Sequence, residues 1–189
     1  HPLKEIQMVE IDKEIVGVAK KYLPFISRGS FADKRLRLSF ENGKDLIRRY
    51  KGYFDVIIVD STDPVGPGKA LFEMNFYRNL HAALGKDGVA IFQIGPFLDF
   101  ELIIKNIAKK LGRLFGFVNP LRLPMPSYSC GCEYCFLLAS KKINPANLTL
   151  PQIKQRLNSR LAKKLNTLRY YTPQIHLASL IMPKVWQIK

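Results

Sequence analysis

The chain has 189 residues, 47% hydrophobic and 24% charged, which fits a globular protein with one sizeable core; no apolar run is long enough to predict a transmembrane helix. The net charge of +15 permits nucleic-acid or anionic-membrane binding, but the lysines and arginines are dispersed, so we interpret them as a solvated basic surface and expect neither partner. The chain begins at His1 without a recognisable signal peptide, and we expect it to be a piece of a longer, cytoplasmic protein.

In the first part of the chain, short apolar runs alternate with segments of helical periodicity. The predicted elements are strand 4–12, helix 13–22, strand 35–40, helix 44–50 and strand 56–59. The last of these has four consecutive apolar residues, too few for a helix, and is typical of a buried parallel strand. It runs directly into Asp60 and Asp63 and then into a loop rich in proline and glycine.

The alternation continues through the second part of the chain. Here we predict helix 71–84, a tight turn at 85–88, strand 89–93, helix 99–111, strand 115–123, strand 132–139, helix 150–168 and a short helix 174–181. The pattern predicts an α/β fold, a doubly wound sheet with right-handed crossovers. We assign residues 1–144 to the α/β domain and residues 145–189 to a basic helical segment that packs on it.

Polar groups follow the predicted strands where an open α/β sheet binds its ligands, past the carboxyl ends. Glu10 can accept hydrogen bonds from two ribose hydroxyls, and Asn42 can accept from an exocyclic amine. Asp12 either points the other way along the strand or caps the next helix. Asp60 and Asp63 are placed to hold or deprotonate a ligand, although aspartates at strand ends also serve as turn or cap residues.

The segment from Tyr53 to Pro67, with FDVIIVDSTDPVGP within it, resembles the signature of the polyamine aminopropyltransferases, spermidine synthases in particular. Residues 9–12 resemble the ribose-binding strand end of that family, residues 71–77 the helix that follows its signature, and residues 168–183 its C-terminal segment. The resemblance covers nearly the whole chain. It implies a Rossmann-like sheet of the class I methyltransferase type, behind a small N-terminal β domain.

The resemblance also implies a reaction: aminopropyl transfer from decarboxylated S-adenosylmethionine to putrescine, giving spermidine and methylthioadenosine. The donor is a co-substrate, and no resident cofactor is implied. Asp60 matches the general base of the family, and a homo-oligomer is implied for the full-length protein. The other matching residues are Asp63, Gln93 and Tyr128 for the amine, and Glu10, Asn42 and Gly43, together with Asp60, for the donor.

The sequence departs from the family pattern at three places. Asn42 stands where the family has an acid, so we expect weaker donor binding rather than its loss. After Gln93, the segment 94–97 is one residue short and lacks an acid, which leaves the acceptor open among putrescine, spermidine, agmatine and cadaverine. The glycine-rich first loop and the β domain would precede His1, so we expect the 189-residue chain alone to be inactive.

Two other functions are alternatives. One is an S-adenosylmethionine-dependent methyltransferase of the same fold, against which Asp63 and the Pro-Val-Gly-Pro loop argue. The other is a non-catalytic, basic RNA-binding module that uses residues 150–169.

The three cysteines, Cys130, Cys132 and Cys135, are odd in number and crowded, which argues against a secreted disulfide scaffold. Their spacing could reach a metal ion, but no fourth ligand is evident nearby. We therefore predict no metal site and interpret the cysteines as packing residues or free thiols.

Overall fold

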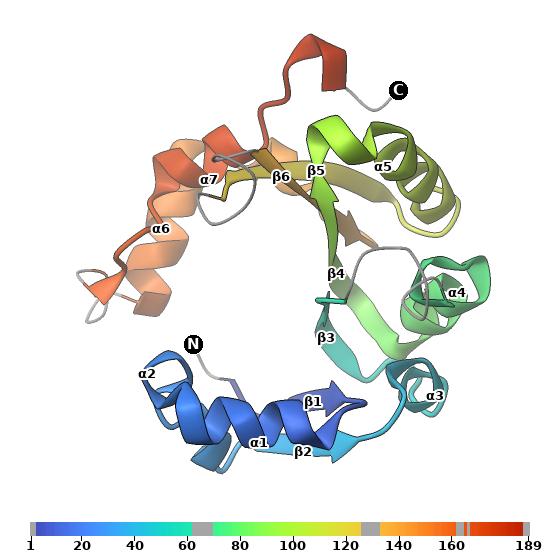
Figure 1. The fold of residues 1–189 in the computed structure, drawn as a ribbon. Helices are drawn as coiled ribbons and strands as arrows, with labels where there is room; N and C mark the ends of the chain where they lie inside the picture. The colour runs from blue at the N-terminus through green and yellow to red at the C-terminus, as the bar shows by residue number, and fades with distance from the viewer. Residues whose placement is uncertain (1–2, 62–69, 126–132, 162–164, 166, 187–189) are drawn as a thin grey trace. The chain divides into compact units, whose positions relative to one another are not determined.

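The structure is a computed structural model that describes residues 3–61, 70–125, 133–161, 165 and 167–186. Figure 1 shows the order of its elements along the chain. The contacts divide the chain into two compact units, residues 1–50 and residues 51–189. The predicted division at residue 144 stays a prediction.

The first unit is built on a parallel pair of strands. Its elements are β1 (Ile6–Glu10), α1 (Lys13–Tyr22), α2 (Pro24–Ser27), the 3-10 turn η1 (Ser30–Ala32), β2 (Leu36–Phe40) and α3 (Gly43–Ile47). The pairing of β1 and β2 runs to Glu10 opposite Phe40, so both strands end together. Asp12 accepts a hydrogen bond from the Glu14 backbone at 2.8 Å and caps α1, the second of the two alternatives open for it. Helix α2 was not predicted; it begins at Pro24, because proline is tolerated in a first helical turn.

The second unit is built on a four-stranded sheet with the order β3-β4-β6-β5. Its elements are β3 (Phe54–Val59), α4 (Met74–Ala83), β4 (Leu84–Pro96), α5 (Phe97–Leu111), β5 (Phe117–Pro124), β6 (Glu133–Ser140), η3 (Pro145–Asn147), α6 (Leu150–Leu161), α7 (Pro173–Ser179) and η5 (Lys184–Trp186). Strands β3 and β4 are parallel, whereas β6 is antiparallel to both of its neighbours. No described helix has the length and hydropathy of a membrane span.

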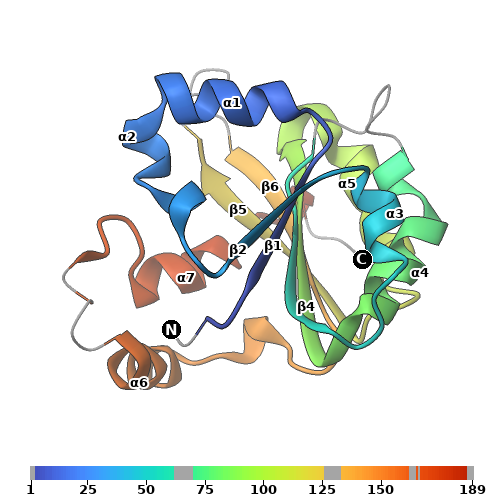
Figure 2. The ribbon, with the colours of Figure 1, turned by 90° about the horizontal axis from the view of Figure 1, so that it is seen from below.

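The core of the second unit lies between the sheet and helices α4 and α5, which lie on the same side of β4 in Figures 1 and 2. Alternate residues of β4 face these helices: Ala90, Phe92 and Ile94 are buried, while the residues between them are half-buried. The ring of Phe92 meets that of Tyr77 edge to face at 5.6 Å. The opposite face of β4 therefore carries the residues that remain accessible.

Two irregularities in β4 adjust its register. The prediction that strand pairing begins only after a turn at 85–88 is wrong, because β4 already pairs with β3 at Leu84. Residues 85–88 form an irregularity in the strand, and the pairing resumes at Val89. The second irregularity is at Gly95, whose φ of +146° favours glycine, and there the register against β6 shifts. A Cβ atom on Gly95 would lie 3.1 Å from the ring of Phe100. Backbone and packing thus both require glycine where β4 leads into α5.

Candidate active site

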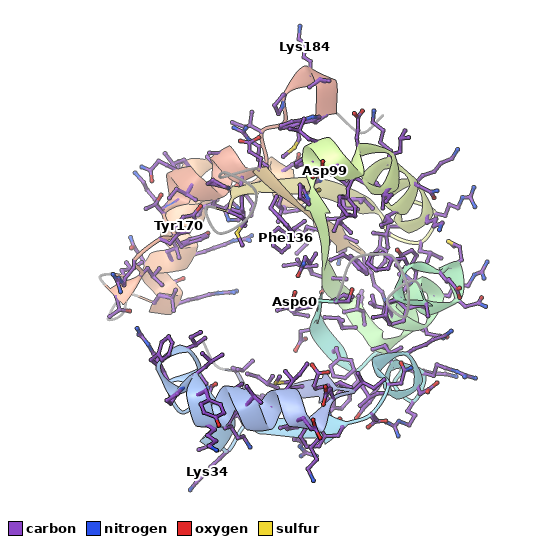
Figure 3. All side chains as sticks on the ribbon, in the orientation of Figure 1. Lys34, Asp60, Asp99, Phe136, Tyr170 and Lys184 are labelled. Carbon is purple, nitrogen blue, oxygen red and sulfur yellow. The ribbon has the colours of Figure 1, made fainter. Side chains whose placement is uncertain are left out.

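Asp60 directly follows β3 and is exposed to solvent. The last residue of β3, Val59, pairs with Phe92, so Asp60 comes to the same level as Gln93 on the neighbouring parallel strand. Phe136 of β6 pairs with Gln93 on its other side. Figure 3 shows Asp60 and Phe136 on the side of the sheet away from α4 and α5. The topology therefore brings a carboxylate, an amide and an aromatic ring into one row on the accessible face.

The side chain of Gln93 is fixed by a tyrosine from β6. Its Nε2 donates to the Tyr134 hydroxyl at 2.9 Å, and Tyr134 is only 4% exposed. With the amide nitrogen held in this way, the Gln93 carbonyl oxygen is the acceptor that a ligand ammonium can use. Gln93 lies three residues inside β4 rather than at its end, because the strand continues through the Gly95 irregularity to Pro96.

Sequence reasoning missed Tyr134 and Phe136. The available signal was the apolar run that predicted strand 132–139; the period of two in a strand places residues 134, 136 and 138 on one face. That signal cannot reveal which strand is the neighbour. Only the antiparallel insertion of β6 beside β4 brings Tyr134 to Gln93.

The first unit carries the residues predicted to bind the donor. Glu10 ends β1, and its Oε1 accepts from the Asp12 backbone at 3.0 Å. Asn42 follows β2 and caps α3, with its Oδ1 accepting from the Lys44 backbone at 2.9 Å. Gly43 begins α3, and a Cβ atom there would meet nothing within 4 Å. Each of these hydrogen bonds uses one acceptor site, so Glu10 keeps its second oxygen and Asn42 keeps the second lone pair of Oδ1, with which it was predicted to accept from an exocyclic amine.

The structure brings the predicted residues together in two groups, Glu10 with Asn42 and Gly43 in the first unit, and Asp60 with Gln93 in the second. The other two predicted site residues, Asp63 and Tyr128, lie outside the described residues. Each group stands where the pairing of two parallel strands ends, although β4 itself continues past Gln93 to Pro96. Ligand-binding residues in this class of sheet are expected at the carboxyl ends of its strands.

Among the cysteines, Cys130 and Cys132 lie outside the described residues. Cys135 is a free thiol, fully buried in β6, and burial raises its pKa. Within the part of the chain that the structure describes, no group of three histidine, cysteine or acidic residues could hold a metal ion. Cys135 thus behaves as a packing residue of the sheet.

Comparison with known proteins identifies the family. The Spermine/spermidine synthase domain matches residues 1–149. The polyamine aminopropyltransferase of Moorella thermoacetica is 38% identical over 184 residues, which cover 97% of this chain and 61% of that protein. The polyamine aminopropyltransferase of Clostridioides difficile is 37% identical over 185 residues, covering 96% and 62% of the two chains. The chain therefore spans about three fifths of the length of these relatives.

Solved structures agree with the sequence comparison. A crystal structure of spermidine synthase in complex with the transition-state analogue AdoDATO matches with a TM-score of 0.83 and 30% identity, over 96% of this chain and 59% of that one. Spermidine synthase from Thermotoga maritima matches with a TM-score of 0.80 and 29% identity, over 96% and 58%. These neighbours confirm the predicted α/β fold of the methyltransferase type. The chain belongs to the spermine/spermidine synthase family.

Proposed function

We propose that this chain is the catalytic part of an aminopropyltransferase that uses decarboxylated S-adenosylmethionine as donor and putrescine as acceptor. The observation that carries the proposal is the position of Asp60, a solvent-accessible carboxylate held at the end of β3 and level with Gln93. Membership of the spermine/spermidine synthase family supports aminopropyl transfer as the reaction in which Asp60 and Gln93 take part.

The chemistry needs such a carboxylate because a diamine is protonated at neutral pH and has no lone pair for attack. Asp60 takes a proton from the reacting ammonium, and the freed nitrogen attacks the carbon next to the donor sulfonium. A C–N bond forms as the C–S bond breaks, and the sulfur keeps the electron pair as a neutral thioether. The sulfonium is already an activated leaving group, so positioning of the two substrates supplies much of the remaining rate enhancement.

The remaining residues divide between the amine site and the donor site. The Gln93 carbonyl, oriented by Tyr134, accepts from the amine, and Asp63 and Tyr128 complete the amine site. Glu10 binds the ribose of the donor, and Asn42, Gly43 and Asp60 bind the rest of it. The reaction uses no resident cofactor; the working protein is a cytoplasmic homo-oligomer.

The test is a product analysis, by mass spectrometry, of the reaction run by the purified full-length protein. Each reaction contains decarboxylated S-adenosylmethionine and one amine: putrescine, spermidine, agmatine or cadaverine. We expect methylthioadenosine and the aminopropylated amine in equal amounts, with putrescine as the preferred acceptor. S-adenosylmethionine replaces the donor in a parallel reaction. Methyl transfer from that donor, with no aminopropyl product from the other, would favour the methyltransferase alternative and refute the proposal.

The activity of the isolated 189-residue chain is a separate question, for which the prediction is that the chain alone is inactive. The same product analysis, carried out on the isolated chain, checks this. Full turnover by the isolated chain would show that residues 1–189 contain a complete donor site.

A further inference from the structure

A surface hollow of about 830 Å³ lies beside the second half of α5, in the second unit and apart from the row that contains Asp60. Cations dominate its lining. The lining residues are Lys105, Asn106, Lys109, Lys110, Arg113, Lys184 and Val185. Five of these seven residues carry a positive charge, and none carries a negative one.

Helix periodicity and one aromatic contact assemble the hollow. Lys105, Lys109 and Arg113 recur every four residues, which aligns them along one side of α5 and its C-terminal turn. Lys184 comes from η5, far away in the sequence. This turn is attached to α5 by Trp186, whose ring stacks on Phe97 with centroids 4.8 Å apart and an interplanar angle of 14°. The second side of the hollow is therefore held in place by packing.

The positive charges in this lining are only partly neutralised. Lys105 is paired with Glu101 at 2.5 Å, and Lys110 donates to the Phe72 carbonyl at 3.2 Å, which leaves further donors on its ammonium. Lys109, Arg113 and Lys184 are exposed and make no ion pair with any described residue. Cations near a helix C-terminus are favourable in themselves, but that effect does not account for Lys184 on a separate element.

We propose that this hollow binds a compact polyphosphate anion, such as a triphosphate group. Its volume is within the range of about 300–1,000 Å³ that small-ligand sites occupy. Lysine and arginine supply many N–H donors to phosphate oxygens within this small space. The described lining residues include no aromatic ring on which a nucleobase could stack, and the neighbouring Trp186 is already stacked on Phe97. Recognition therefore rests on the charge and phosphate geometry of the ligand rather than on a base.

The probe is inorganic tripolyphosphate, titrated into the purified chain by calorimetry at low ionic strength and again at about 0.15 M. The test variant is the pair Lys109→Gln and Arg113→Gln, and the matched control is the pair Lys154→Gln and Arg156→Gln on α6. All four residues are exposed, and both pairs lower the net charge by the same amount. Thermal melting of each variant verifies that it is folded.

The hollow pair is expected to weaken tripolyphosphate binding about tenfold, the control pair less than about twofold, and Lys184→Gln alone about threefold. Equal losses in the hollow and control pairs, or no loss for Lys184→Gln, would overturn the site, because binding would then follow net charge alone. Tighter binding of mixed-sequence single-stranded RNA, at equal phosphate concentration and unaffected by the hollow pair, would overturn the choice of a small anion. Lys184 lies outside α5, so Lys184→Gln still tests whether the hollow binds tripolyphosphate if the double variant unfolds.

Discussion

Replacing Gly95 with alanine should destabilise the second unit through two separable effects. The backbone there has φ +146°, a conformation that residues with a side chain rarely adopt. The new methyl group would also lie 3.1 Å from two atoms of the Phe100 ring. Because Gly95 marks the register shift between β4 and β6, the same change disturbs the alignment of Gln93 with Tyr134.

The structure allows the size of each effect to be bounded. A non-glycine residue held in a sparsely populated backbone region costs about 1–3 kcal/mol. Inserting a methyl group against a packed ring costs about 1–3 kcal/mol more. The total expected for Gly95→Ala is therefore about 2–6 kcal/mol, of which only the second part depends on Phe100.

Urea unfolding measures the total, followed by the fluorescence of Trp186, the only tryptophan in the chain and part of the same unit. Gly85→Ala is the control, since its Cβ would approach nothing closer than 3.7 Å. In a Phe100→Ala background, Gly95→Ala should cost about 1–3 kcal/mol less than in the wild-type background. A Gly95→Ala loss as small as that of the control, or one unchanged by Phe100→Ala, would refute the reasoning.

Three further expectations concern single contacts. Tyr134→Phe removes the partner of the Gln93 amide, so the free energy of unfolding should fall by about 1 kcal/mol and the KM for the amine should rise by a larger factor than kcat falls. Unchanged kinetics would show that Gln93 does not belong to the amine site. The thiol of Cys135, studied with the other two cysteines replaced by serine, should react with a thiol reagent only on unfolding, and rapid native-state labelling would contradict its burial. The Nδ1 of His176 lies 2.9 Å from the Tyr171 hydroxyl, its Nε2 is buried with no hydrogen-bond partner among the described residues, and burial lowers its pKa below the usual 6.5. The unfolded chain then binds the proton more tightly, so the unfolding free energy should decrease as pH falls from 6.5 towards the lowered pKa; His176→Gln should make this decrease shallower, and an identical pH dependence would contradict it.

Local patterns were sufficient to predict most elements of the fold. The apolar run before Asp60 predicted β3, and helical periodicity predicted α1 and α4 to within a few residues of their observed ends. The glycines at 85 and 88 led to a wrong boundary because glycine suits a turn and also suits an irregularity within a strand. Here β4 pairs with β3 both before and after the irregularity.

Contacts between residues far apart in sequence were beyond prediction from one sequence. Periodicity indicates which face of a strand is apolar but not which strand lies beside it, so the hydrogen bond between Gln93 and Tyr134 could not be foreseen. Likewise, the dispersed lysines and arginines suggested an evenly basic surface. The packing of Trp186 on Phe97 instead brings Lys184 to the cations of α5.

The proton-accepting role of Asp60 is the central claim, and single-turnover kinetics of Asp60→Asn tests it most directly. The amide has a similar shape but cannot take a proton from the amine, so aminopropyl transfer should slow by about 10²–10⁴-fold when donor and amine are both saturating. Saturation separates this loss from any weakening of the donor contact that is also proposed for Asp60. Asp55→Asn, an exposed aspartate within the same strand, is the control and should react at the wild-type rate. A rate for Asp60→Asn within a few-fold of wild type would contradict the account.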